Sequence, residues 1–163
     1  MFYPWYDPFP VILDKADLSE ADDLAEIHAS GFHRGWSPAE IEALLVQDNM
    51  IALVGRRGSW FGSRRPVGFL LVRATGDEAE VLTLAVLPAH RRRGIGRLLM
   101  EEAMRRLYAD RVASLFLEVD EGNEAAVTLY RRLGFKQVGQ RGNYYAVKDG
   151  PPATALVMRA DIV

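Results

Sequence analysis

Positive charge and glycine meet in one short stretch of the chain. Residues 91–93 are three arginines, and Gly94, Gly96 and Arg97 follow them at the start of an apolar helical pattern. A helix start has unpaired backbone N–H groups and about half a positive charge, and glycine lets an anion approach the backbone. Arginine adds charge-assisted hydrogen bonds. The stretch therefore predicts a cradle for a diphosphate, and the competing interpretation is a solvated basic loop with flexible glycines.

The glycine spacing separates this stretch from two other phosphate-binding motifs. Leu99 stands where the dinucleotide-binding fingerprint has its third glycine, so that fingerprint is broken. The sequence also lacks the Gly-x-x-x-x-Gly-Lys-Ser/Thr pattern of a P-loop. The pattern that remains is Arg91-x-x-Gly94-x-Gly96. Because each glycine costs roughly 1 kcal/mol in a helix relative to alanine, their presence favours a functional reason.

Apolar periodicity predicts the elements that must position this stretch. Strands are expected at residues 11–17, 51–56, 67–74, 78–86, 113–119, 135–140 and 153–161. Helices are expected at residues 18–32, from 38 onward, at 95–110 and at 124–133. The strand at 113–119 is apolar enough to be buried on both faces. In the helix from 95, one face carries Ile95, Leu98, Leu99, Ala103 and Leu107.

Capping signals mark the helix ends. Asp17 with Glu20, and Ser37 with Glu40, have the spacing of capping boxes, and Pro38 fits a first helical turn. Gly134 fits the position just past a helix C-terminus. Strands alternating with helices, without repeats or linkers, predict one α/β domain over residues 1–163, with residues 1–10 as an aromatic, proline-rich N-terminal arm.

Composition excludes several function classes. The chain has 163 residues, 49% of them hydrophobic, and a formal net charge of −2, so it is not built to coat nucleic acid or an anionic membrane. It contains no cysteine, which excludes disulfides and a cysteine nucleophile and fits a reducing cytoplasm. No apolar run is long enough to span a membrane, and the N-terminus lacks the pattern of a signal peptide.

The Arg91-x-x-Gly94-x-Gly96 pattern resembles the pyrophosphate-binding signature of the GNAT acetyltransferases, which bind acetyl-CoA. The order of the expected elements also resembles that family. Within it, residues 81–159 are most similar to the bacterial N-terminal alanine acetyltransferases of ribosomal proteins, and residues 31–44 resemble their substrate-side helices less specifically. The resemblance implies the GNAT fold, an α/β single domain with a mixed, mostly antiparallel central sheet flanked by helices.

The resemblance also implies roles for individual residues. Glu118 matches the family's general base, and Tyr130 matches its general acid. The residues that match the acetyl-CoA site are Leu84, Ala85, Val86, Arg91, Arg92, Arg93, Gly94, Ile95, Gly96, Arg97 and Asn123. The chain departs from the family at Arg91, where many relatives have glutamine, and at Gly142, where arginine is common.

Elementary chemistry is compatible with these two catalytic roles. An amine attacks a thioester only when it is neutral, and the departing thiolate must gain a proton. A tyrosine hydroxyl with a pKa of about 10 is a suitable donor, and a carboxylate at the end of a strand is a suitable base. The alternatives are that Tyr130 belongs to an apolar stripe of the core and that Glu118 marks a strand end facing solvent.

The acceptor amine can be narrowed by its pKa. An α-amine has a pKa of about 8 and lysine about 10.4, so lysine is roughly 3 kcal/mol harder to deprotonate at neutral pH. A single glutamate therefore suits an N-terminus better. By resemblance, Tyr144 and Tyr145 flank the incoming peptide and Trp36 lies on the substrate side, although packing explains Trp36 as well. The histidines lack ligand-like spacing, so no metal is expected.

Three functions are compatible with the sequence. The first is acetyl-CoA-dependent acetylation of a protein N-terminus, with the N-terminal alanine of a small-subunit ribosomal protein implied by resemblance. The second is acetylation of a small amine or of lysine side chains. The third is an acetyl-CoA sensor without turnover, against which Glu118 and Tyr130 argue. The expected enzyme is a cytoplasmic monomer or weak dimer without membrane attachment. Direct nucleic-acid binding is not expected, because no aromatic residues interleave with the arginine block.

Overall fold

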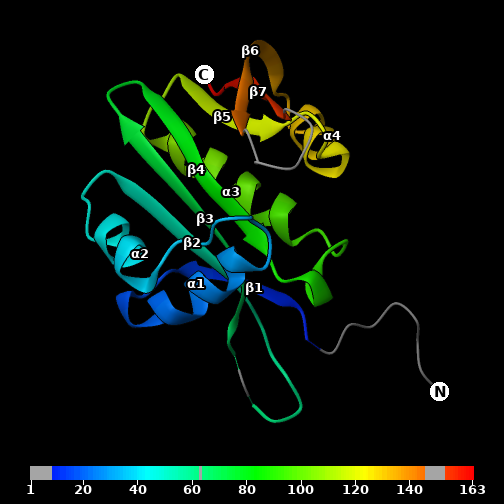
Figure 1. Ribbon diagram of the computed structural model, residues 1–163. Helices are drawn as coiled ribbons and strands as arrows, with labels where there is room; N and C mark the ends of the chain where they lie inside the picture. The colour runs from blue at the N-terminus through cyan, green and yellow to red at the C-terminus, as the bar shows by residue number, and fades with distance from the viewer. Residues whose placement is uncertain (1–8, 63, 146–152) are drawn as a thin grey trace, which may run out of the picture. The chain divides into compact units, whose positions relative to one another are not determined.

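The computed structural model of the protein describes residues 9–62, 64–145 and 153–163, which Figure 1 draws in colour. At residues 143–145 and 153 it describes only the backbone. Residues 1–8 of the N-terminal arm expected at residues 1–10 thus lie outside the described residues. The strands are β1 (Val11–Lys15), β2 (Met50–Arg57), β3 (Pro66–Thr75), β4 (Glu78–Val86), β5 (Ser114–Asp120), β6 (Lys136–Tyr145) and β7 (Ala153–Asp161). The α-helices are α1 (Ala21–Ala29), α2 (Pro38–Leu45), α3 (Ile95–Ala109) and α4 (Glu124–Arg132).

The strands form one mixed sheet in the order β1-β2-β3-β4-β5-β7-β6. Strands β4 and β5 pair in parallel, whereas β1 with β2, β5 with β7, and β6 with β7 pair antiparallel. This confirms the predicted fold class, a mixed and mostly antiparallel sheet with helices, and the predicted order of elements.

The packing divides the chain into two compact units. The first unit contains residues up to Leu71 together with Thr83–Met100, and the second contains Val72–Leu82 together with Glu101–Val163. Strands β3 and β4 and helix α3 continue from one unit into the other.

In the first unit, both predicted capping boxes form, although only α2 begins directly at its box and α1 begins later than expected, at Ala21. The Asp17 side chain accepts from Ser19 N and the Glu20 side chain accepts from the Asp17 backbone, so the capping box is formed. A short 3-10 helix, Leu18–Glu20, precedes α1, which ends at Ala29 rather than at residue 32 as expected. The Ser37 capping box opens α2 with Pro38 in its first turn.

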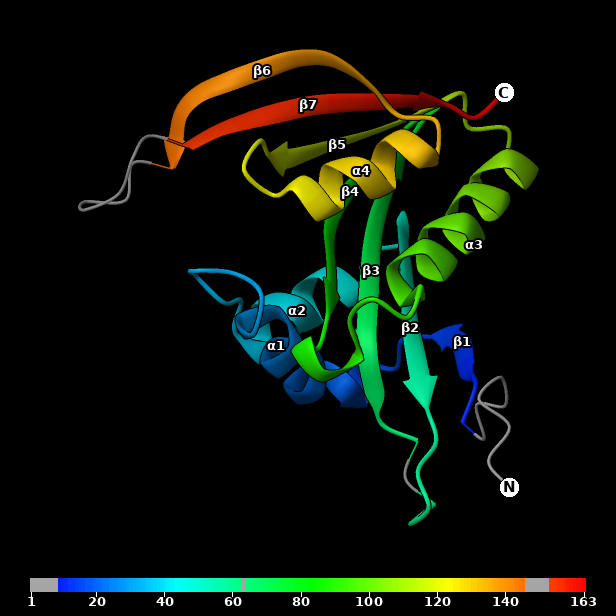
Figure 2. The same cartoon turned by 90° about the vertical axis from the view of Figure 1, so that its right-hand side faces the viewer.

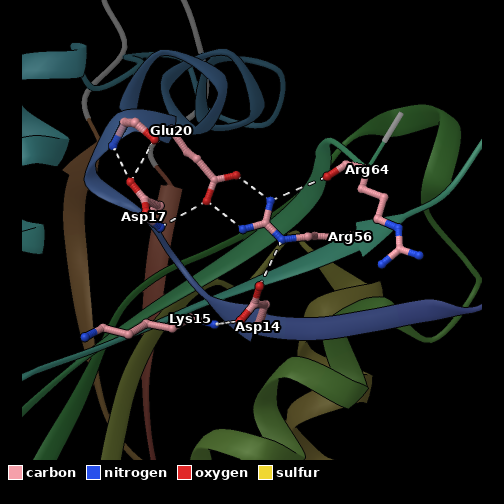
Figure 3. Close-up of polar contacts among 7 residues, drawn as sticks. Asp14, Lys15, Asp17, Glu20, Arg56 and Arg64 are labelled. Carbon is pink, nitrogen blue, oxygen red and sulfur yellow. Dashed lines mark hydrogen bonds and ion pairs between the residues drawn. The ribbon is translucent and has the colours of Figure 1, made fainter. Parts of the chain in front are cut away.

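An ion-pair cluster ties β2 to the start of α1. The Arg56 guanidinium donates from Nη2 to Glu20 Oε1 at 2.7 Å and from Nε to Asp14 Oδ2 at 3.3 Å (Figure 3). The Arg56 and Glu20 side chains are only 17% and 13% exposed. The guanidinium lowers the pKa of Glu20, mainly through its hydrogen bond to the carboxylate. The cluster therefore fixes the entry into α1, since its two main members are nearly removed from water.

Helix α3 begins in the core of the first unit. Ile95 is 2% exposed, and its Cγ2 lies 3.1 Å from the position of a Cβ on Gly55 and 3.2 Å from that of a Cβ on Gly68. Glycine at these two strand positions therefore makes room for Ile95. Leu99 and Met100 are fully buried, but Leu98 is 41% exposed, so placing Leu98 on the buried face was wrong. The apolar stripe of this first turn is narrower than the sequence pattern suggests.

The second unit is built on the antiparallel strands β5, β7 and β6, with α4 beside them (Figure 2). Leu115, Leu117, Leu156 and Met158 form its buried face, each at most 4% exposed. On β5 the alternate residues Glu118 and Asp120 are exposed. The expectation that this strand is buried on both faces was therefore wrong, because its partner β7 pairs antiparallel and leaves one face open.

Candidate active site

The turn before α3 contains two residues in the left-handed region. Arg92 has φ 63° and Gly94 has φ 76°. The left-handed conformation costs about 1–2 kcal/mol for a residue with a Cβ, and such strain is concentrated at functional sites. A Cβ on Gly94 would meet no atom within 4 Å, so the backbone angle requires glycine here rather than the space around it. The sequence predicted the glycine but not the strained arginine two positions before it.

The charge around this turn suits a phosphate. Arg92 and Arg93 are exposed, and their side chains make no hydrogen bond or ion pair with any residue that the structure describes. No acidic residue occurs from residue 81 to residue 100, and the first turn of α3 carries none. Unpaired guanidinium groups beside a helix N-terminus are the donor set that a diphosphate takes. The chain's own residues thus fit the diphosphate of acetyl-CoA.

Arg91 has a structural task in addition to the predicted one. Its Nε donates to the Val86 carbonyl oxygen at 3.0 Å, which fastens the turn to the end of β4. The other four N–H donors of a guanidinium lie on its two Nη atoms, so a phosphate contact stays a prediction for Arg91. Leu84, Ala85 and Val86 lie on β4 as expected, with Ala85 6% exposed. Their pairing with the coenzyme likewise stays a prediction.

Ile95, Gly96 and Arg97 form the first turn of α3. The buried side chain of Ile95 faces the core, so only its backbone is available to a ligand. Gly96 is half-buried and Arg97 is exposed. This arrangement leaves the predicted cradle with two kinds of donor, backbone amides and arginine side chains.

Glu118 lies in the second unit, on the open face of β5. Its side chain is 33% exposed, and its Oε1 forms an ion pair with Arg141 Nε at 3.1 Å. The registered pairs of β4 with β5 end at Glu80 and Phe116, and from Leu117 onward the registered partners of β5 are on β7. The Glu118 carboxylate thus lies near the end of β5 on a partly open face, where a substrate can reach it as a general base requires.

Tyr130 lies on α4 and is buried, with 7% exposure. Its ring packs against Phe135. Burial raises the pKa of Tyr130 to about 12, so the hydroxyl keeps its proton throughout the physiological range. Tyr130 is therefore in the protonated form that a proton donor needs and is unsuited to act as a base. No hydrogen bond joins Tyr130 to Glu118 or to another described side chain.

Asn123 has a clear structural role. Its Oδ1 accepts from the backbone N–H of Ala126 at 3.2 Å, which caps the N-terminus of α4. The side-chain amide remains exposed, and the predicted coenzyme contact of Asn123 stays a prediction.

Trp36 is held by a histidine that the sequence analysis did not assign. The backbone N–H of Trp36 donates to His28 Nδ1 at 3.1 Å, and the His28 ring is stacked with both Phe32 and Trp36 at centroid distances of 4.3 Å. Burial lowers the pKa of His28, and the Glu40 carboxylate opposes this effect. Packing therefore accounts for Trp36, and its contact with substrate stays a prediction. The side chains of Tyr144 and Tyr145, the other expected substrate contacts, lie outside the described residues.

The ion pair of Arg141 with Glu118 was not predicted from the sequence. Arg141 reaches Glu118 only because of the local register of β6, which apolar periodicity does not reveal. Gly139 inside the strand pattern was the available signal, since glycine in a strand often marks a bulge. Among the residues that the structure describes, no group of side chains could hold a metal ion, and no helix is long and apolar enough to span a membrane.

Comparison with known proteins identifies the family of this chain. The model of the acetyltransferase (GNAT) family matches residues 21–135. Ribosomal protein bS18-alanine N-acetyltransferase of Escherichia coli is 42% identical over 82 residues, which cover 50% of this chain and 55% of that protein. The matched segment thus spans about half the length of that relative. N-alpha-acetyltransferase RimI of Mycobacterium tuberculosis is 34% identical over 161 residues, which cover 95% of both chains.

A solved structure gives the same result. The crystal structure of the ribosomal-protein-S18-alanine N-acetyltransferase from Escherichia coli matches with a TM-score of 0.84 and 26% identity, covering 94% of both chains. The similarity extends beyond residues 81–159, the segment whose sequence resemblance is strongest.

Proposed function

Because this chain belongs to the GNAT family of acetyltransferases, we propose that it is a cytoplasmic enzyme that acetylates the N-terminal amine of a protein. The proposed donor is acetyl-CoA, and the proposed acceptor is the N-terminal alanine of a small-subunit ribosomal protein. The observation that carries the proposal is the pair of an open carboxylate, Glu118, and a buried tyrosine that stays protonated, Tyr130. The names of the relatives support the choice of acceptor.

The turn before α3 is the proposed binding site for the diphosphate of acetyl-CoA. Arg92 and Arg93 supply unpaired positive charge, and the backbone of residues 94–97 supplies amide donors. Arg91 joins them with the donors that Val86 does not use. Leu84, Ala85, Val86 and Asn123 complete the proposed coenzyme contacts. The bound coenzyme supplies a thioester, whose carbonyl carbon accepts the amine.

Glu118 and Tyr130 divide the proton transfers between them. Glu118 takes a proton from the attacking amine, directly or through a water molecule, and Tyr130 gives its proton to the departing sulfur. A tyrosine pKa of about 12 exceeds that of an exposed thiol by roughly 3.5 units, which opposes the transfer. Apolar surroundings also raise the pKa of a thiol, because they disfavour the thiolate. Burial at Tyr130 is therefore compatible with donation only if the sulfur is equally removed from water.

The proposed acceptor follows from the acid–base chemistry. An α-amine needs about 3 kcal/mol less than a lysine to become neutral at pH 7, and Glu118 is the single base proposed. Trp36, Tyr144 and Tyr145 are the proposed contacts of the peptide. The acidic residues Asp120, Glu121 and Glu124 are exposed near the start of α4, and their charge favours a basic peptide.

The test is an acetylation assay with a panel of acceptors. The purified protein and acetyl-CoA are incubated with peptides that begin with alanine, with the same peptides blocked at the N-terminus but containing lysine, and with polyamines. Mass spectrometry is expected to find one acetyl group on the free N-terminus of the alanine peptides. Faster acetylation of lysine peptides or polyamines would contradict the proposed acceptor, and coenzyme binding without thiol release would favour a sensor.

A further inference from the structure

Strand β6 contains an irregularity that decides where Arg141 points. Gln137 pairs with Met158 on β7, but Gly139 pairs with Val157, so Val138 is an extra residue in the ladder. Val138 is 49% exposed, as expected for a bulged residue that leaves the sheet. From Gly139 to Arg141, β6 is shifted by one position relative to β7, and a second irregularity follows between Arg141 and Tyr145.

This shift moves Arg141 to the face of Glu118. Arg141 pairs with Ala155, and Glu118 pairs with Val157 on the other side of β7. Ala155 and Val157 are two residues apart and therefore share a face, which Glu118 and Arg141 also occupy. Without the bulge, Arg141 would stand opposite Thr154, on the face of Leu156 and Met158, which are 4% and 0% exposed.

Small residues let the two charged side chains meet across β7. Ala155, between them, is a short side chain and is 1% exposed, and Gly139, opposite Val157, has none. Arg141 Nε lies 3.1 Å from Glu118 Oε1, while the two side chains are 54% and 33% exposed. Ion pairs with this exposure contribute at most about 1 kcal/mol to stability. The bulge and the small residues are therefore poorly explained by a need for folding energy.

We propose that Arg141 is a positioning residue for Glu118, an inference that rests on the proposed acetyltransferase function. The guanidinium holds the carboxylate through the contact between Nε and Oε1, and the oriented carboxylate takes the proton from the amine. The positive charge of Arg141 also disfavours a second cation at this place, so a neutral amine approaches Glu118 more readily than an ammonium group. Arg141 takes no proton and forms no bond with the substrate in this scheme.

The experiment measures kcat, the KM values for an alanine-initiated peptide and for acetyl-CoA, and the urea unfolding midpoint in four variants. Arg141→Gln removes the charge, Arg141→Lys restores it with a shorter reach, and Glu118→Gln removes the base. Arg159→Gln is the matched control, because Arg159 on β7 is 45% exposed and pairs with Asp161 at 3.4 Å. We expect Arg141→Gln to lower kcat about 10- to 100-fold with the KM for acetyl-CoA and the urea unfolding midpoint unchanged, as removal of an orienting group does. Arg141→Lys is expected to recover part of kcat, and Arg159→Gln to behave as the unsubstituted protein.

A double substitution and a spectrum separate the possible failures. In the Glu118→Gln background, Arg141→Gln is expected to have no further effect on kcat. Full turnover in Arg141→Gln, or an equal loss in both backgrounds, would overturn the role of Arg141 while the proposed function stands. Full turnover in Glu118→Gln would overturn the proposed base as well. Independently of activity, the Nε–H resonance of Arg141 is expected to shift in Glu118→Gln, and an unchanged resonance would contradict the pairing itself.

Discussion

The Tyr130 ring packs against Phe135 at a centroid distance of 5.7 Å, with the two planes tilted by 58°. This contact fixes the ring without engaging its hydroxyl. The Tyr130→Phe variant is therefore expected to keep the packing and to lose only the proton donor. A general acid contributes about 10²- to 10⁴-fold, so kcat is expected to fall at least about 100-fold while the Kd for acetyl-CoA is unchanged. Steady-state kinetics and calorimetry measure the two quantities.

Tyr108 provides the control for this prediction. It lies on α3 and is 64% exposed, so Tyr108→Phe removes a hydroxyl from the surface without changing the proposed site. Turnover in Tyr108→Phe is expected to match the unsubstituted protein. A parallel fall of kcat and coenzyme affinity in Tyr130→Phe would instead assign Tyr130 to the core.

Two arginines with the same backbone conformation allow the cradle to be tested. Arg92 with φ 63° and Arg111 with φ 60° are both exposed. Asparagine adopts this conformation more readily than arginine, so Arg92→Asn and Arg111→Asn remove a charge without disturbing the fold. Arg92→Asn is expected to weaken acetyl-CoA binding about tenfold, the effect of one charge-assisted hydrogen bond, and Arg111→Asn is expected to leave it unchanged. Equal affinity of the two variants in calorimetry would refute the cradle.

His28 makes the stability of the first unit sensitive to acid. Burial depresses the pKa of His28, and Nδ1 must be unprotonated to accept from Trp36 N–H. The unfolded state therefore binds a proton more readily than the folded state. The stabilisation is fully present above the unfolded pKa of about 6.5 and is lost as pH falls through the lower folded pKa. Urea unfolding at pH 7.5 and at pH 5 is expected to show a lower free energy of unfolding at pH 5.

His28→Asn isolates this effect, because its side-chain oxygen can accept from Trp36 N–H without titrating. The variant is expected to be less stable at pH 7.5, since the stacked ring is lost, and to show a smaller change between the two pH values. His33→Gln, at an exposed position, is the control and is expected to keep the full change. The same change in His28→Asn as in the unsubstituted protein would assign the acid sensitivity to other groups.

The Arg56–Glu20 pair is expected to matter for folding far more than a surface pair does. Glu20→Gln leaves the nearly buried Arg56 without its main partner and is expected to lower the free energy of unfolding by on the order of 2 kcal/mol. Arg34→Gln, which breaks a pair whose side chains are 85% and 45% exposed, is expected to change it little. Because the pKa of Glu20 is lowered in the folded state, its contribution is present above the unfolded pKa of about 4.5 and lost as pH falls through the folded value. Similar losses in both variants would contradict this ranking.

Local signals predicted most of the elements. Strand β4 has the bounds expected from its alternation, and both capping boxes and Gly134 with φ 96° stand where short-range rules place them. These features depend on residues within a few positions of one another, so they can be predicted from the sequence alone. The extent of burial on β5 was not predictable in this way, since it depends on which strand becomes its neighbour.

Contacts between residues far apart in the chain could largely not be predicted from the sequence. The Arg141–Glu118 pair depends on the local register of β6, and the Arg56–Glu20 pair joins residues 36 positions apart. Glu118 and Tyr130 were assigned through family resemblance, and the structure adds the exposure of one and the burial of the other. Periodicity alone left both residues with ordinary structural explanations.

The extra residue in β6 implies that this strand tolerates change at residue 138 but not a further residue between the bulge and Arg141. Val138 points out of the sheet, so most side chains are acceptable at that position. Deleting residue 138 would join Gln137 directly to Gly139 and keep Gly139 opposite Val157 and Arg141 opposite Ala155, so the guanidinium would stay on the face of the carboxylate. One more residue between Gly139 and Arg141 would instead place the guanidinium on the face of Leu156 and Met158. Among descendants of this gene, substitutions and deletions at residue 138 should therefore accumulate freely, whereas single-codon insertions between residues 139 and 141 should be eliminated.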